Sequence, residues 1–169
     1  MGSPGVRRIV AVIDSDPDTT EMLKTMLEFS GMVAATGSLI DFRLGKESLL
    51  DFLALTKPDV ILYDLGVPYE VNYHFLQKAR EDPAFPRCGI VLTTTNARAV
   101  ESLLGIRAVE LLGKPYDLNV LVEAVRTATW SESLTMTAEA ADSERRRGDR
   151  RSGGRRAGDN EDAPERAVG

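Results

Sequence analysis

Carboxylate, hydroxyl and ammonium groups recur directly after the short apolar runs of this 169-residue chain. They are Asp14, Ser15 and Asp16 after residues 9–13, Asp64 after residues 60–63, Thr93 and Thr94 after residues 90–92, and Lys114 after residues 109–112. Carboxylates that meet at one place resist joint ionisation unless a cation lies among them. Magnesium, a hard ion held in proteins by one or two carboxylates and waters, would relieve that repulsion. The residue types therefore predict a magnesium site, provided that the fold brings them together.

The apolar runs have the composition of strands in one parallel sheet. Residues 9–13 and 60–63 offer no polar face, which is typical of strands covered by helices on both sides. Strands are predicted at residues 9–13, 32–36, 60–63, 90–92 and 109–112, with helices from Pro17 to Gly31, at 47–55, 72–80 and 97–104, and from Asp117 onward. Five strand–helix repeats predict an α/β fold with a doubly wound, five-stranded parallel sheet. Residues 37–45 fit no element.

Two helices carry recognisable start signals and apolar stripes. Asp16 is a predicted N-cap with Pro17 at the first helical position, and Asp117 is the predicted N-cap of the last helix. The predicted buried stripes are Met22, Leu23, Met26 and Leu27 in the first helix, and Leu118, Leu121, Val122 and Val125 in the last. In an open parallel sheet, ligands bind outside the carboxyl ends of the strands. The acidic, hydroxyl and lysine side chains should thus converge on one edge.

Composition excludes several classes of function. The net charge is −5. The chain has a single cysteine and a single histidine, so an intrachain disulfide is impossible. For the same reason, few residues are present that could form a zinc site or a Ser-His-Asp triad. No glycine-rich phosphate-binding motif of the dinucleotide or P-loop kind occurs. The longest apolar run near the start has five residues, too few for a membrane span or a secretory signal, so we expect a cytoplasmic protein.

The last 39 residues differ from the rest. Residues 131–169 contain no aromatic side chain and few large aliphatic ones, so they are predicted to be a disordered tail after a domain at 1–130. Seven arginines are concentrated between residues 145 and 156: Arg145, Arg146, Arg147, Arg150, Arg151, Arg155 and Arg156. The alternatives are a solvated tail, a contact with nucleic acid or an anionic lipid surface, and a dinucleotide-messenger site suggested by the Arg147–Arg151 spacing.

Four segments together resemble the receiver domains of bacterial two-component response regulators. They are residues 9–17, 58–68, 90–93 and 114–115, and the resemblance spans about residues 7–128. It implies a flavodoxin-like, receiver-type sheet. It also implies a stand-alone receiver, because no folded output domain fits into the remaining residues.

The resemblance assigns a role to each residue at the strand ends. Asp64 would be the phosphoacceptor, forming an acyl phosphate. Asp14, Asp64 and the main-chain carbonyl of Gly66 would hold Mg²⁺, with Asp16 as a further candidate. Thr93 and Lys114 would contact the phosphoryl group, and the Lys114–Pro115 peptide would be cis.

Three positions depart from the usual receiver pattern. Ser15 stands where receivers usually have a second acidic residue, so magnesium binding is predicted to be weaker. Leu111 replaces the tyrosine or phenylalanine of the signalling face, which predicts damped coupling. Thr94 stands in place of a small residue and would narrow access to the phosphoryl group.

These observations predict a single-domain response regulator, which is a switch and not an enzyme. A histidine kinase or phosphotransfer protein would phosphorylate Asp64, and a face at about residues 97–112 would bind a downstream protein. The alternative is a phosphorylation-independent receiver-like interaction module, with polyanion binding through the arginine-rich tail. His74 is interpreted as a surface residue, Cys88 as a packing residue, and Trp130 as closing the last helix against the domain.

Overall fold

The computed structural model of the chain describes residues 7–98, 100, 111–114 and 117–130, with only the backbone for residues 111–113. The strands are β1 (Ile9–Asp14), β2 (Val33–Ser38), β3 (Val60–Asp64), β4 (Gly89–Thr94) and β5 (Leu111–Gly113), and the helices are α1 (Pro17–Phe29), α2 (Leu39–Arg43), α3 (Leu49–Thr56), α4 (Tyr69–Arg80) and α6 (Leu118–Thr127). All strand pairs are parallel, in the order β2-β1-β3-β4-β5. This confirms the predicted doubly wound parallel sheet.

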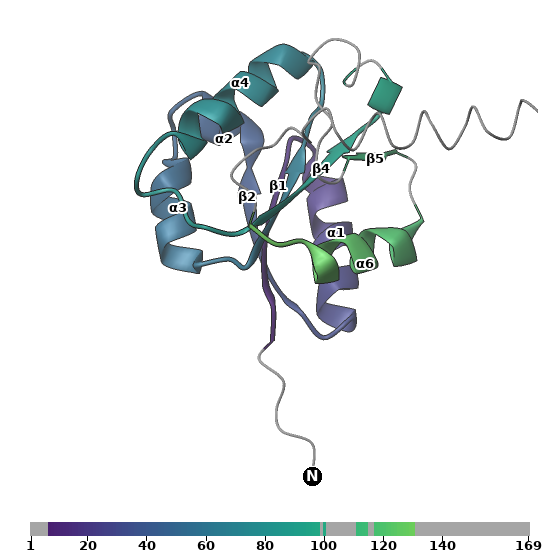
Figure 1. Ribbon diagram of the computed structural model, residues 1–169. Coiled ribbons are helices and arrows are strands. Elements are labelled where there is room, and N and C mark those ends of the chain that lie inside the picture. The colour runs from purple at the N-terminus through teal and green to yellow at the C-terminus, as the bar shows by residue number, and fades with distance from the viewer. Residues whose placement is uncertain (1–6, 99, 101–110, 115–116, 131–169) are drawn as a thin grey trace, which may run out of the picture. The chain divides into compact units, whose positions relative to one another are not determined.

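Helices cover both faces of the sheet, as the uniformly apolar strands require (Figure 1). On one face, alternate strand residues such as Val12 and Leu62 pack with Leu23 of α1 and Leu121 of α6. On the other face, the intervening strand residues pack with α2, α3 and α4. The two apolar clusters fix the sheet between two helical layers, and they leave the carboxyl ends of the strands at one edge.

Helix α1 begins as predicted, since the Asp16 side chain accepts a hydrogen bond from the backbone N–H of Asp18 and Pro17 occupies the first helical position. Its buried stripe is narrower than predicted. Leu23 is buried, but Met22 is 47% exposed because it lies on the outer side of the helix. In α6, likewise, Leu118 is 44% exposed because it stands in the first turn at the end of the core.

The connection between β2 and β3 contains the two short helices α2 and α3, where the sequence predicted only the second. Ser38 and Ser48 are the N-caps, and their hydroxyls accept hydrogen bonds from Asp41 and Asp51 main-chain N–H groups at 3.2 Å each. A turn with Gly45 at φ +70° separates the two helices. Residues 37–45, which fitted no element in the sequence, therefore form the end of β2, α2 and the turn at Gly45.

Helix α4 begins at Tyr69, three residues before the predicted start at Asn72. Its N-cap is Pro68, which accepts the first helical hydrogen bond, from the Asn72 main-chain N–H, through its carbonyl. The Val67–Pro68 peptide is cis. Several predicted features lie outside the described residues. They are the cis peptide at Lys114–Pro115, most of the helix at 97–104, most of the switching face at 97–112, and the whole tail at 131–169. Within the described part of the chain, no helix is both long and apolar enough to cross a membrane.

The segment after α6 contacts the sheet at the amino-terminal end of β4. A Cβ atom on Gly89 would lie 2.7 Å from the carbonyl carbon of Ala128, so only glycine lets the two backbones approach this closely. Trp130 then packs, partly buried, against the cluster on the α4 face, with the Arg80 guanidinium carbon 5.1 Å from its ring centre. The predicted closing role of Trp130 is confirmed.

Arg8 joins the two ends of the domain. Its guanidinium donates to the carbonyls of Val125 (3.1 Å), Arg126 and Ala128 (2.6 Å) at the end of α6. The last carbonyls of a helix have no partner within the helix, and a cation there also interacts favourably with the helix dipole. Arg8 thus anchors the last helix to the strand that ends in Asp14.

We expect Arg8→Met to lower the free energy of unfolding by about 1–3 kcal/mol, because it leaves these carbonyls without their charged donor. Urea unfolding followed by circular dichroism measures the change. Arg7→Met is the matched control, since Arg7 is exposed and the same charge is lost. Equal effects of the two substitutions would contradict the anchoring role.

Candidate functional site

Main-chain hydrogen bonds hold the carboxyl ends of β3, β4 and β5 in fixed register. Asp64 lies beside Thr93 in the β3–β4 pair, and the Leu65 N–H donates to the Thr93 carbonyl at 2.7 Å. The Lys114 N–H donates to the Thr94 carbonyl at 2.6 Å. The sheet, not the side chains, therefore decides where these residues stand.

Alternation along the strands selects which side chains share the site. Side chains two residues apart on a strand point to the same face of the sheet. The residues two positions before Asp14, Asp64 and Thr93 all pack on the face covered by α1 and α6. Thr94 has the opposite parity and is buried, and its hydroxyl accepts from the Asn96 N–H at 3.3 Å. Thr94 thus caps a turn on the other side of the strand, and its effect on access to a phosphoryl group stays a prediction.

The Lys114 ammonium group joins the two carboxylates. Its Nζ lies 2.9 Å from Asp64 Oδ1 and 3.1 Å from Asp14 Oδ2. Asp14 is 4% exposed, Asp64 is 6% exposed, and the lysine side chain is 21% exposed. Residues separated by 50 and 100 positions in the sequence thus form one buried ionic cluster with two negative charges and one positive charge.

The pKa values of Asp64 and Lys114 follow from burial and from the charges beside them. Burial raises the pKa of Asp64; the Lys114 hydrogen bond opposes this, and the charge of Asp14 adds to it. Burial by itself would lower the pKa of Lys114, but the hydrogen bond and charge of Asp64, with those of Asp14, raise it overall. Lys114 therefore remains charged, and it offsets only part of the cost of burying the Asp64 carboxylate.

Gly66 leaves space for the second oxygen of Asp64. A Cβ atom at position 66 would lie 2.9 Å from Asp64 Oδ2, too close for a carboxylate already held by Lys114. The Gly66 main-chain N–H also hydrogen-bonds this carboxylate and lowers its pKa, less strongly than Lys114 does. The glycine thus gives the carboxylate a donor without crowding it.

Asp16 has a different role from the two buried carboxylates. One of its oxygens accepts from the Asp18 N–H at 3.1 Å and the other from the Thr19 hydroxyl at 2.7 Å. The Thr19 hydrogen bond and then the Asp18 N–H lower the pKa of Asp16. Its own N–H donates to Asp14 Oδ1 at 2.9 Å. Asp16 therefore supports Asp14 through its backbone, while its carboxylate caps α1.

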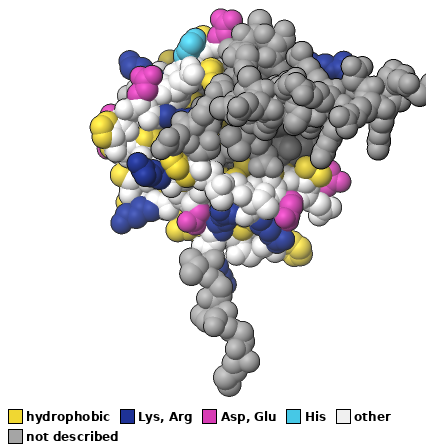
Figure 2. All heavy atoms as spheres, viewed as in Figure 1, with side chains coloured by type: hydrophobic (Ala, Val, Ile, Leu, Met, Phe, Trp, Pro, Cys, Tyr) yellow, Lys and Arg dark blue, Asp and Glu magenta, His cyan; other side chains and the backbone are white. Residues whose placement is uncertain are grey.

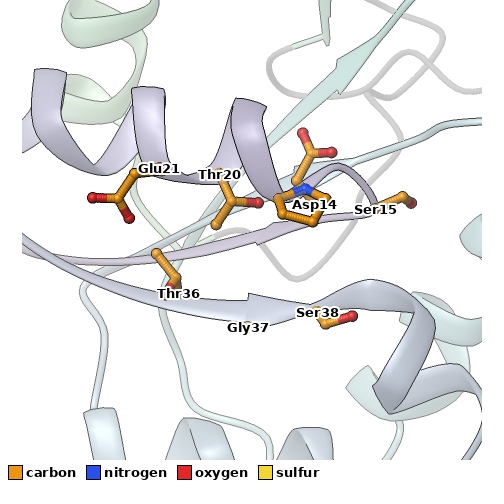
Figure 3. A pocket seen from close by; sticks show the side chains of 8 residues that line it. Asp14, Ser15, Thr20, Glu21, Thr36, Gly37 and Ser38 are labelled. Atoms are coloured by element: carbon orange, nitrogen blue, oxygen red, sulfur yellow. The ribbon is translucent and has the colours of Figure 1, made fainter.

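A polar pocket of ≈ 270 Å³ opens beside Asp14, between α1 and β2 (Figure 3). Thr20 of α1 and Thr36 of β2 lie on opposite walls. Ser15, at the position where receivers usually have a second acid, lines this pocket and is half-buried.

The cluster offers the donor chemistry that magnesium takes. Asp14, Asp64 and the Gly66 carbonyl supply hard oxygen atoms, and two carboxylates are as many as magnesium commonly uses. The cost of burying the negative charge of Asp64, which keeps the pKa of this carboxyl raised, is the feature of this structure that a cation would relieve. Among the described residues, no group of three or more acidic, histidine or cysteine side chains is gathered. The residues fit a magnesium ion held largely by water.

The structure brings together Asp14, Asp64, Gly66, Thr93 and Lys114 as the sequence predicted. The Leu111 side chain and the seven tail arginines lie outside the described residues. The other interpretations are confirmed: His74 is exposed, and Cys88 is buried, which raises the pKa of its thiol to about 12.

Sequence reasoning missed one buried polar group, the side chain of Asn72. Its Nδ2 donates to the Gly66 carbonyl at 2.8 Å, and its Oδ1 accepts from Arg43 Nη1 at 2.9 Å. The Tyr63 hydroxyl donates to the main-chain carbonyl of Asn72 at 2.7 Å. An asparagine in the first turn of a helix reads as a solvated residue in sequence, and only the packing of α2 against α4 reveals its partners.

Comparisons with known proteins agree with this architecture. Response regulator Rre1 of Synechocystis sp. is 27% identical over 117 residues, which cover 68% of this chain and 48% of that protein. A solved structure described as a transiently phosphorylated "switch" in bacterial signal transduction is 26% identical, with a TM-score of 0.54, and the match covers 72% of this chain and 94% of that one. A response regulator from Thermotoga maritima shares the fold at 22% identity, with a TM-score of 0.56 and coverage of 72% and 96%. No family model matches the chain.

The sheet order, the strand-end cluster and these relatives together identify a receiver domain of the response-regulator type in this chain. The chain spans about half the length of Rre1. The likeness therefore covers a receiver and not the whole of that relative.

The raised pKa of Asp64 predicts a stability effect with a definite sign. The folded state disfavours the ionised carboxylate, so stability falls as pH rises from the ordinary aspartate value of 3.8 through the raised value. We expect Asp64→Asn to unfold at higher urea concentration than the original chain at neutral pH, and this gain to disappear as the pH falls to 3.8. Asp41→Asn should show the opposite sign, because the hydrogen bond from Lys46 lowers the pKa of Asp41. A loss of stability in Asp64→Asn at neutral pH would contradict the electrostatic assignment.

Removing the shared cation should have the reverse effect. Lys114→Met leaves two buried carboxylates without their ammonium partner, and we expect a loss of about 3 kcal/mol at neutral pH. Lys46→Met is the control, since it breaks an exposed pair with Asp41 and should change stability by less than about 1 kcal/mol. Urea titrations of both variants measure the difference, and equal losses would argue against a buried ionic cluster.

Proposed function

We propose that this receiver accepts a phosphoryl group on Asp64 from a histidine kinase or phosphotransfer protein, and so acts as a switch and not as an enzyme. The observation that carries the proposal is the Lys114 ammonium group held 2.9 Å from the Asp64 carboxylate and 3.1 Å from that of Asp14. That arrangement supplies a nucleophile and a positive charge beside it. The relationship to Rre1 and to a structure described as a phosphorylated switch supports the same function.

Phosphoryl transfer asks little of a protein beyond position and charge neutralisation. An Asp64 oxygen forms the new bond to phosphorus while the bond from phosphorus to the donor breaks, and the donor leaves with that electron pair. The product is an acyl phosphate. Lys114 faces the negative charge of the transferred group, and Thr93 in the adjacent strand register offers a hydroxyl. A magnesium ion held by Asp14, Asp64 and the Gly66 carbonyl would add positive charge at the phosphoryl oxygens.

The switch would operate through the partners of the new phosphoryl group. Lys114 bonds Asp14 and Asp64 directly before the transfer. After it, the added charge would draw Lys114 and Thr93 towards the phosphoryl oxygens and shift the population of conformations. The face at residues 97–112 is where a downstream protein would read that shift.

Intact-protein mass spectrometry at neutral pH tests the proposal. We expect acetyl phosphate with magnesium to add one phosphoryl group to the full chain, and omission of magnesium to suppress the addition. Asp64→Asn should abolish it. Asp51→Asn is the matched control, because Asp51 is an exposed aspartate on α3 and should leave the added mass unchanged.

Two results would overturn the proposal. One is a folded chain that gains no phosphoryl group from acetyl phosphate or from a phosphorylated histidine protein. The other is an Asp64→Asn variant that still gains one, which would place the modification elsewhere.

A further inference from the structure

The carbonyl of Gly66 is held by a series of hydrogen-bonded side chains that lie outside the site around Asp64. Asn72 in the first turn of α4 donates to that carbonyl at 2.8 Å, and Arg43 at the end of α2 donates to Asn72 at 2.9 Å. Three separate segments, α2, α4 and the loop after β3, are therefore joined by two hydrogen bonds in series. The loop they hold is the one that follows Asp64.

The burial of Asn72 shows that these bonds are specific. Its side chain is 1% exposed, so its amide has left water and must be bonded within the protein. The oxygen and the nitrogen each have one partner, and the partners require opposite ends of the amide. Arg43 can only donate and the Gly66 carbonyl can only accept, so the amide can be turned only one way.

The backbone around Asn72 is held independently of its side chain. Its N–H donates to the Pro68 carbonyl at 3.2 Å, and its carbonyl accepts from the buried Tyr63 hydroxyl at 2.7 Å. The first turn of α4 therefore has its own attachment to β3. The side-chain carboxamide of Asn72 therefore has a separate role, which is to fix the direction of the Gly66 carbonyl.

We infer that Asn72 is a positioning residue for the cation site, and that Arg43 keeps Asn72 in the required orientation. A carbonyl oxygen has two lone pairs; Asn72 occupies one and thereby directs the other. Groups that orient metal ligands from outside the first shell commonly change metal affinity by about 10–100-fold. This inference rests on the proposed magnesium-dependent phosphorylation of Asp64.

An orienting role and a purely electrostatic role of Arg43 predict opposite changes in magnesium affinity. If only long-range charge mattered, removing this cation would make the surroundings more negative and would strengthen magnesium binding. If Arg43 acts by orienting Asn72, removing it weakens magnesium binding. The sign of the change therefore separates the two explanations.

Isothermal titration of the full chain with magnesium chloride, without a phosphodonor, is the test. We expect Asn72→Ala to weaken magnesium binding by about tenfold, and Arg43→Met to weaken it by a smaller factor. The double variant should be no weaker than Asn72→Ala, because both substitutions break one series of bonds. Lys46→Met is the charge-matched control, since Lys46 pairs with Asp41 at 2.9 Å, and we expect it not to weaken binding.

Phosphorylation by acetyl phosphate supplies a second readout. At limiting magnesium, Asn72→Ala should be labelled more slowly than the original chain, and saturating magnesium should restore the rate. A generally damaged fold would not be rescued in this way. Arg43→Met repeats the test at an exposed position, where the substitution removes no buried side chain.

The outcomes separate this inference from the proposed function. If the original chain binds no magnesium and gains no phosphoryl group, the proposed function fails. If the original chain does both, and Asn72→Ala and Arg43→Met bind magnesium with unchanged or higher affinity, the positioning role fails while the proposed function stands.

Discussion

The structure depends on one constraint, the enclosure of two carboxylates around a single ammonium group at the edge of the sheet. Asp14 and Asp64 are almost completely buried, and Lys114 is their shared partner. Such a cluster is unfavourable to form, because the contacts with Lys114 offset only part of the cost of burying the Asp64 carboxylate. Parallel pairing of β1 with β3 and of β4 with β5, together with the two apolar layers, holds it in place.

This arrangement explains how a stable scaffold can carry a buried ionic cluster. The energy that maintains the cluster comes from elsewhere in the domain, namely from the covered sheet and from attachments such as Arg8 at the end of α6. Among the described residues on the face seen in Figure 2, charged side chains of both signs and apolar side chains are interspersed. The cost of burying charge is concentrated at the strand ends, where a cation would relieve it.

The loop after Asp64 shows how the connections contribute to the site. Gly66 is small enough to leave room for the carboxylate, and its carbonyl is held by Asn72. Asn72 in turn is held by Arg43 at the end of α2. A short helix before α3 thus reaches, through Asn72, the backbone of the loop after Asp64.

The sequence by itself determined the sheet, the capped start of α1 and the convergence of Asp14, Asp64, Thr93 and Lys114. Apolar strands with polar residues at their carboxyl ends leave few other arrangements. It could not determine α2, the exposure of Met22 or the partners of Asn72. Those depend on contacts between residues about thirty positions apart in the sequence, and local secondary-structure propensity does not encode such contacts. Tertiary packing alone decided that an asparagine became part of the site.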